Sequence, residues 1–177
     1  MLWVRRPAAK TLEGYCAHMD MLVTLDQIDA QEQRFASAFA AGDVSKARDL
    51  YHPGVVYLSP TTRLFGSTRR VEGLDATIEF IQLTIGGCRN ITYRLDERAV
   101  LPGETTAYTR IVFDWDTDEG SRVRSIYVVV YRYRDGLIGQ QELYYDPNAP
   151  LEPVTDSRGA PGWWWFTALN DPARPHT

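Results

Sequence analysis

The chain has 177 residues, of which 44% are hydrophobic, and a formal net charge of −4. This length suits one domain with its own core, and the mildly acidic balance argues against a nucleic-acid partner, which demands a basic face. No apolar run approaches the roughly 20 residues that a membrane-spanning helix needs, and the start MLWVRRPAAK lacks the apolar segment of a signal peptide.

The N-terminal half predicts an arm followed by three helices. Residues 1–22 are mixed in character and form the arm. Residues 24–41 show helical periodicity, with a capping box at Thr24 and Gln27 and a buried stripe of Leu25, Ile28, Phe35 and Phe39. A short helix follows over residues 44–51, and residues 74–85 repeat apolar side chains at helical spacing.

The later segments predict strands. Residues 55–58 form a short strand, and residues 61–72 read as a polar loop. Apolar and polar residues alternate around Tyr93 and around Phe113, which is typical of strands with one buried face. Residues 121–146 form two long strands joined by a tight turn at Asp135-Gly136, and we expect this hairpin in the middle of the sheet.

The composition changes after residue 146. Six prolines punctuate residues 147–177, which we interpret as a C-terminal extension to a domain spanning residues 23–146. The run Trp163-Trp164-Trp165-Phe166 is apolar enough that it should cover a surface of its own sheet or of a partner subunit. The two cysteines, Cys16 and Cys88, form no motif; they could pair, but reduced thiols in a cytoplasmic protein are the simpler interpretation.

Three stretches of the sequence resemble the NTF2-like (SnoaL-like) family. They are FAAGDVSKARDLYHPGVVYLSP at 39–60, the glycine-led helix at 73–85 and RDGLIGQQELYYD at 134–146. The resemblance implies an α+β cone, in which three N-terminal helices pack on a strongly curved, mostly antiparallel sheet and enclose a pocket. Members of this family differ widely in activity, so function has to be argued from the site.

The catalytic residues that the resemblance would transfer are replaced in this chain. At the ketosteroid isomerase positions stand Phe35 for the tyrosine, Ser59 for the aspartate base and Val129 for the second acid. A serine hydroxyl is too weak a base to take a proton from carbon unaided. The epoxide hydrolase pattern keeps only Arg110, since Leu143 occupies its final aspartate position. No histidine lies on a predicted strand, which argues against a scytalone-dehydratase-like site.

The family positions and strand alternation together predict which side chains bind a ligand. Odd-numbered residues of the last strand face the pocket, as do those of its neighbour, while Glu142 faces away unless the assignment is inverted. The expected ligand-binding residues are Phe35, Tyr57, Ser59, Tyr127, Val129, Gln141 and Leu143. The tyrosines also fit a simple packing role, and Ser59 before Pro60 also fits a turn.

The expected catalytic residues are Asp114, Arg110 and Tyr145. Arg110 would polarise a substrate oxygen while Asp114 moves a proton. A strand register shifted by one residue is an equal alternative, because it buries Ile111, Phe113 and Trp115 and sends Arg110 and Asp114 to solvent.

The outer face of the hairpin predicts an interface. Ile126, Val128 and Val130 lie there between arginines, which favours a homodimer or a dock for the C-terminal tail over simple two-sided burial. We expect a small enzyme that performs acid–base chemistry, without metal or cofactor, on an apolar polyketide-, terpenoid- or steroid-like molecule. The alternative is a non-catalytic module for ligand binding or assembly.

Overall fold

The computed structural model describes residues 22–66, 69–102, 104–145 and 152–153. The predicted N-terminal arm, apart from its last residue, and the Trp163–Phe166 cluster lie outside these residues. The elements follow the order α1 (Leu25–Ala40), η1 (Val44–Leu50), β1 (Tyr51–Leu58), η2 (Pro60–Phe65), β2 (Arg70–Glu72), α2 (Leu74–Ile85), β3 (Arg89–Val100), β4 (Thr106–Asp116), β5 (Arg122–Arg134), β6 (Leu137–Tyr144) and β7 (Glu152–Pro153).

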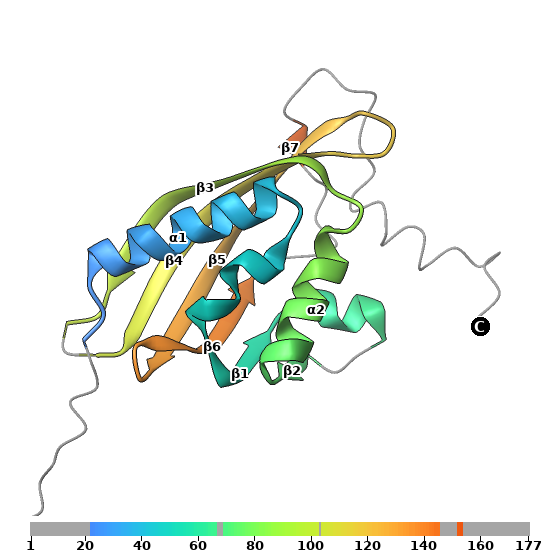
Figure 1. Ribbon diagram of the computed structural model, residues 1–177. Helices are drawn as coiled ribbons and strands as arrows, with labels where there is room; N and C mark the ends of the chain where they lie inside the picture. The colour runs from blue at the N-terminus through green and yellow to red at the C-terminus, as the bar shows by residue number, and fades with distance from the viewer. Residues whose placement is uncertain (1–21, 67–68, 103, 146–151, 154–177) are drawn as a thin grey trace, which may run out of the picture.

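One mixed sheet carries the fold, with strand order β2-β1-β6-β5-β4-β3 and β7 paired to β5 off this path (Figure 1). Its pairs are antiparallel except for β1 with β6. The β5–β6 hairpin lies in the middle, as predicted. Its turn residues Asp135 and Gly136 have φ values of 53° and 77°, the conformation that favours Asp-Gly in a two-residue hairpin.

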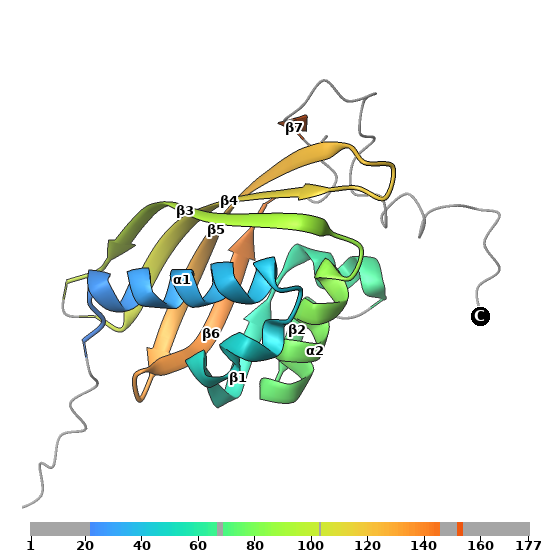
Figure 2. The ribbon, with the colours of Figure 1, turned by 45° about the horizontal axis from the view of Figure 1, so that its top comes forward.

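The helices cover one face of this sheet (Figure 2). α1 packs along β3, and α2 packs against β1. The predicted capping box begins α1, where Thr24 accepts from the Gln27 backbone and the Gln27 side chain accepts from the Thr24 backbone. The prediction that Leu25 belongs to the buried stripe is wrong, because this residue lies in the first turn of α1 and is exposed.

Two predicted segments differ from the structure. The second helix is a 3₁₀-helix that ends at Leu50, and Tyr51 already belongs to β1. The predicted polar loop at residues 61–72 contains most of η2 and the edge strand β2, which pairs with β1 between Val56↔Glu72 and Leu58↔Arg70. The fold is therefore α+β, with helices distributed before and after the first strand.

Strand alternation separates a buried inner face from a charged outer face. On β5, Val123, Ser125, Val129 and Tyr131 are buried, whereas Ile126 and Val128 on the other face are exposed. Phe35 of α1 packs on the inner face, with ring centroids 6.4 Å from Tyr131 and 5.9 Å from Tyr51. Within the described residues, no helix is long and apolar enough to cross a membrane.

Candidate functional site

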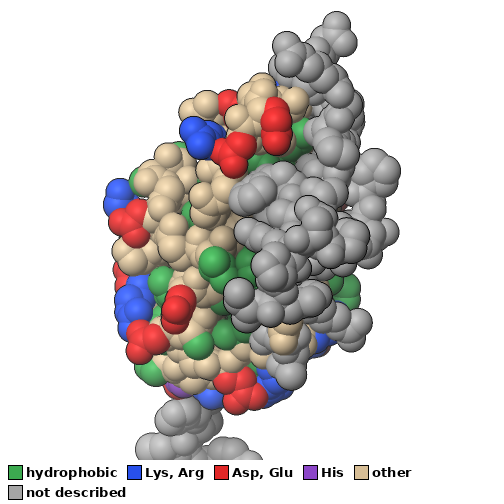
Figure 3. Space-filling view, turned by 90° about the vertical axis from the view of Figure 1, so that its right-hand side faces the viewer, with side chains coloured by type: hydrophobic (Ala, Val, Ile, Leu, Met, Phe, Trp, Pro, Cys, Tyr) green, Lys and Arg blue, Asp and Glu red, His purple; other side chains and the backbone are tan. Residues whose placement is uncertain are grey.

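A small cavity of about 60 Å³ lies between the helices and the inner face of the sheet. α1, β1 and α2 form one side, and strands β3 to β6 form the other. Most of its wall is aromatic, and its lining residues are Phe35, Phe39, Tyr57, Thr61, Thr84, Ile85, Tyr93, Phe113, Tyr127, Gln141, Leu143 and Tyr145. Viewed from the side on which α2 lies, the molecule shows hydrophobic side chains among acidic and basic ones (Figure 3).

Two hydrogen-bonding groups of this wall are available to a ligand. The Tyr51 hydroxyl donates to Gln141 Oε1 at 2.5 Å, and this bond fixes the Gln141 amide. Among the described residues, neither Gln141 Nε2 nor the Tyr127 hydroxyl has a hydrogen-bond acceptor. Both side chains line the cavity, so an oxygen atom of a bound molecule would find two donors there.

Hydroxyl groups gather at the β1 side of the cavity. The Ser59 and Thr61 hydroxyl oxygens lie 2.6 Å apart, and Thr62 Oγ1 donates to the Ser59 carbonyl at 2.8 Å. Burial raises the pKa of the neighbouring Tyr57 and Tyr145, with hydrogen bonds to Ser59 opposing the rise in both. These phenols are therefore neutral near pH 7 and act as hydrogen-bond donors or acceptors.

The structure brings most of the expected ligand-binding side chains to one place. Phe35, Tyr57, Tyr127, Gln141 and Leu143 line the cavity, as does Tyr145. Ser59 and Val129 do not: Ser59 is buried in the turn that holds Thr61, and Val129 is packed within the core.

The expected catalytic pair lies on the wrong face for this cavity. Arg110 pairs with Asp96 and Glu97 on the outer face, and Arg124 donates to both Asp114 carboxylate oxygens at 2.8 and 3.1 Å. The shifted register is correct because it buries three apolar side chains of β4, namely Ile111, Phe113 and Trp115. The pocket role expected of Arg110 and Asp114 is thus corrected.

Glu142 also faces outward, which supports the parity assigned to β6. Its carboxylate lies 3.4 Å from the Arg69 guanidinium and 3.9 Å from that of Arg132. In the described part of the chain, no carboxylate, histidine, lysine or arginine lines the cavity, and no cluster of histidine, cysteine or acidic side chains has the arrangement of a metal site.

Sequence reasoning missed a buried acid, Glu32, which is only 2% exposed on the inner face of α1. The Tyr93 hydroxyl donates to its Oε2, and Gln31 Nε2 donates to its Oε1 at 3.2 Å. Burial raises the pKa of Glu32 to about 7, although these hydrogen bonds oppose the rise. The signal was in the sequence, since Glu32 stands four residues after Ile28 and three before Phe35, within the stripe predicted to be buried.

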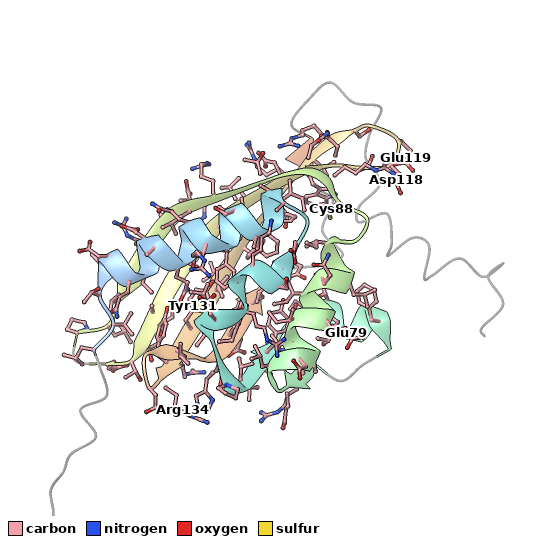
Figure 4. All side chains as sticks on the ribbon, in the orientation of Figure 1. Glu79, Cys88, Asp118, Glu119, Tyr131 and Arg134 are labelled. Carbon is pink, nitrogen blue, oxygen red and sulfur yellow. The ribbon has the colours of Figure 1, made fainter. Side chains whose placement is uncertain are left out.

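Two tyrosines of β5 lie near this carboxyl group: Tyr131 approaches it directly, and Tyr133 acts through Gln31. The Tyr133 hydroxyl donates to Gln31 Oε1 at 2.9 Å, which orients the amide that binds Glu32. Tyr131, whose ring lies between α1 and the sheet, approaches the carboxyl group without the geometry of a full hydrogen bond (Figure 4). Glu32 is thus held by neutral groups.

Solved structures with this fold come from several bacteria. An NTF2-like protein from Anabaena variabilis ATCC 29413 is 17% identical, with a TM-score of 0.60 over 70% of this chain and 89% of that one. TsrD from Streptomyces laurentii is 16% identical, with a TM-score of 0.56 over 69% and 90% of the two chains. RV0760c from Mycobacterium tuberculosis, in complex with estradiol-17β-hemisuccinate, is 19% identical, with a TM-score of 0.55 over 68% and 94%.

These likenesses establish the fold, and the sequence itself establishes the family. No curated protein has a sequence that matches the chain significantly. The signature of the SnoaL-like domain, however, matches residues 33–140, which include the second half of α1, all of β5, the first half of β6 and most of the cavity wall. The chain therefore belongs to the family of SnoaL-like domains.

Proposed function

We propose that this protein binds a small, mostly apolar organic molecule. The ligand would carry a ring that packs against the aromatic cavity wall and one oxygen atom that accepts hydrogen bonds from the protein. The observation that carries this proposal is the aromatic cavity into which Tyr127 and Gln141 bring two donors with no partner among the described residues. Ligand sites are commonly apolar with a few placed polar groups. The steroid conjugate bound by RV0760c supports a ring compound as the ligand class.

The size of the cavity narrows the ligand further. At about 60 Å³ it is well below the 300 to 1,000 Å³ typical of drug-sized sites. Even one or two rings therefore require the wall to widen, since a cavity that holds benzene measures roughly 150 Å³, and a complete steroid would require several aromatic side chains to move. We infer that the natural ligand is a polyketide-, terpenoid- or steroid-like molecule, and that only one end of it enters the cavity.

The test is calorimetric titration with 2-tetralone, a bicyclic ketone, and with tetralin, which has the same rings and no acceptor. We expect 2-tetralone to bind more tightly, and Gln141→Leu and Tyr127→Phe each to weaken its binding about three- to tenfold, the usual worth of one hydrogen bond. Tyr144→Phe, on the exposed outer face, serves as the matched control. Equal affinity for both compounds in all four proteins would contradict the proposal.

A second candidate function is enzymatic, and the buried acid Glu32 next to the cavity wall favours it. The reaction would be acid–base chemistry without a cofactor, such as isomerisation, cyclisation, dehydration or hydrolysis. Here Tyr145 would donate to a substrate oxygen. Exchange of the α-hydrogens of 2-tetralone in D₂O, followed by NMR, measures this chemistry directly. Acceleration by the native protein and its loss in Tyr145→Phe would support it, and a rate equal to that in buffer would exclude it.

We further propose a cytoplasmic homodimer formed through the outer face of the sheet, with residues 147–177 contributing to the interface and residues 1–22 as an accessory arm. The exposed side chains of Ile126, Val128 and Tyr144 support this arrangement.

A further inference from the structure

Glu32 is a carboxyl group without a cation. No arginine, lysine or histidine of the described chain pairs with it, and the groups that contact it are the Gln31 amide and two tyrosines, Tyr93 and Tyr131. The other charged side chains that line the surface pocket beside Glu32 are already paired. Asp29, one turn earlier on α1, pairs with Arg98 of β3, and Arg94 pairs with Asp96.

Such a carboxyl group favours its neutral, protonated form, because a buried carboxylate without a compensating charge is costly. The hydrogen bonds from Gln31 and Tyr93 reduce this cost only in part, so burial still raises the pKa of Glu32 to about 7. Near neutral pH the group therefore exists in both forms, and small changes around it shift the balance.

Tyr93 connects this acid to the cavity. Its ring forms part of the cavity wall, stacked on Phe39 with centroids 5.1 Å apart, while its hydroxyl donates to Glu32. When Glu32 is ionised, the Tyr93 hydroxyl donates its only hydrogen to the carboxylate and cannot donate to a ligand. When Glu32 is protonated, the carboxylic acid can donate to the Tyr93 oxygen, and the Tyr93 O–H becomes available for another acceptor.

We propose that Glu32 is a positioning residue of the ligand cavity that acts through Tyr93, so that binding of a ring ketone is coupled to protonation of Glu32. The inference rests on the proposed binding function. In the complex, the carboxylic acid donates to Tyr93, and Tyr93 donates to the ligand oxygen.

Calorimetry with 2-tetralone at about pH 7, in two buffers with different heats of ionisation, measures the protons taken up on binding. Because free Glu32 is about half ionised at this pH, we expect the native protein to take up as much as about half a proton. We also expect its affinity to be several-fold higher at about pH 5.5 than at about pH 8.5, since binding that takes up protons weakens as pH rises.

Two variants separate the acid from its link to the cavity. Glu32→Gln keeps the shape of the side chain and imitates the protonated acid, because its amide accepts through one group and donates through the other. Its binding should show no proton uptake and equal affinity at both pH values. Tyr93→Phe keeps the ring of the wall and removes the link, so it should lose most of the pH dependence. Proton uptake and pH-dependent affinity are measured on the native protein, so the inference can be tested even if one of the variants fails to fold.

The outcomes distinguish this inference from the proposed function. Absence of 2-tetralone binding at every pH would overturn the proposed function and the inference with it. Binding without proton uptake, and with equal affinity at both pH values, would overturn the inference alone. Proton uptake that persists in Glu32→Gln would also overturn it, since another group would then be responsible.

Discussion

The residue with the largest expected influence on pH-dependent stability is Glu32. Its pKa is about 7 in the folded chain against an ordinary value of 4.5, so between these values the folded state binds a proton that the unfolded state has lost. Stability must then fall as pH rises through this window and level off above it. The difference corresponds to a loss on the order of 3 kcal/mol.

Glu32→Gln tests this expectation without ligand. The native protein should lose free energy of unfolding between about pH 4.5 and pH 7.5, and the variant should lose much less, because its amide does not ionise. Urea unfolding of both proteins across this range gives the comparison. If the difference between them stayed constant over the whole range, Glu32 would not be the group that titrates.

The candidate site shows which residues sequence reasoning can place. The family positions put Gln141 inside, and strand alternation then put Glu142 outside, where the structure places it. On β4, a pocket role for Arg110 and Asp114 required the face opposite to the apolar side chains of Ile111, Phe113 and Trp115, and burial of the apolar face decided the register. Glu32 was missed because carboxylates are rarely buried. A glutamate within a helix is therefore expected to face solvent, even where its position falls within the apolar stripe.

At the scale of elements, turn chemistry and capping were the most informative local signals. Asp135-Gly136 predicted the central hairpin and Thr24 with Gln27 predicted the start of α1, since each requires a specific backbone geometry. The edge strand β2 was missed because Arg70–Glu72 is only three residues long and has a single apolar side chain, Val71. Its pairing with β1 comes from the tertiary fold, which local patterns do not encode.

The hairpin turn supplies the prediction at this scale. Gly136→Ala places a Cβ at a φ of 77°, which costs about 1 to 2 kcal/mol of stability. Gly54→Ala is the control, because that glycine has no left-handed φ and its added Cβ would meet the His52 ring at an ordinary 3.5 Å. Thermal unfolding should show a lower melting temperature for Gly136→Ala alone. Equal melting temperatures for both variants would show that the turn is not constrained as described.

At the scale of the whole molecule, the two faces of the sheet have different partners. The helices and the aromatic core cover the inner face, whereas Tyr108, Ile126, Val128 and Tyr144 remain exposed on the outer one. Arginine–carboxylate pairs surround these side chains, including Arg124 with Asp114 and Arg132 with Glu142. An apolar centre within a charged rim is the composition of a protein interface, and a second copy would meet it symmetrically.

Ile126→Lys tests this dimer. In a two-fold interface each substituted side chain would lie near its own copy and near the arginines of the rim, so the variant should be monomeric at concentrations where the native chain is dimeric. Leu83→Lys is the matched control, since Leu83 is also an exposed apolar residue but lies on α2, on the helical side of the sheet. Size-exclusion chromatography with light scattering gives the mass of each protein. A monomeric native chain would refute the dimer, and a dimer that survives Ile126→Lys but not Leu83→Lys would move the interface from the sheet to the helices.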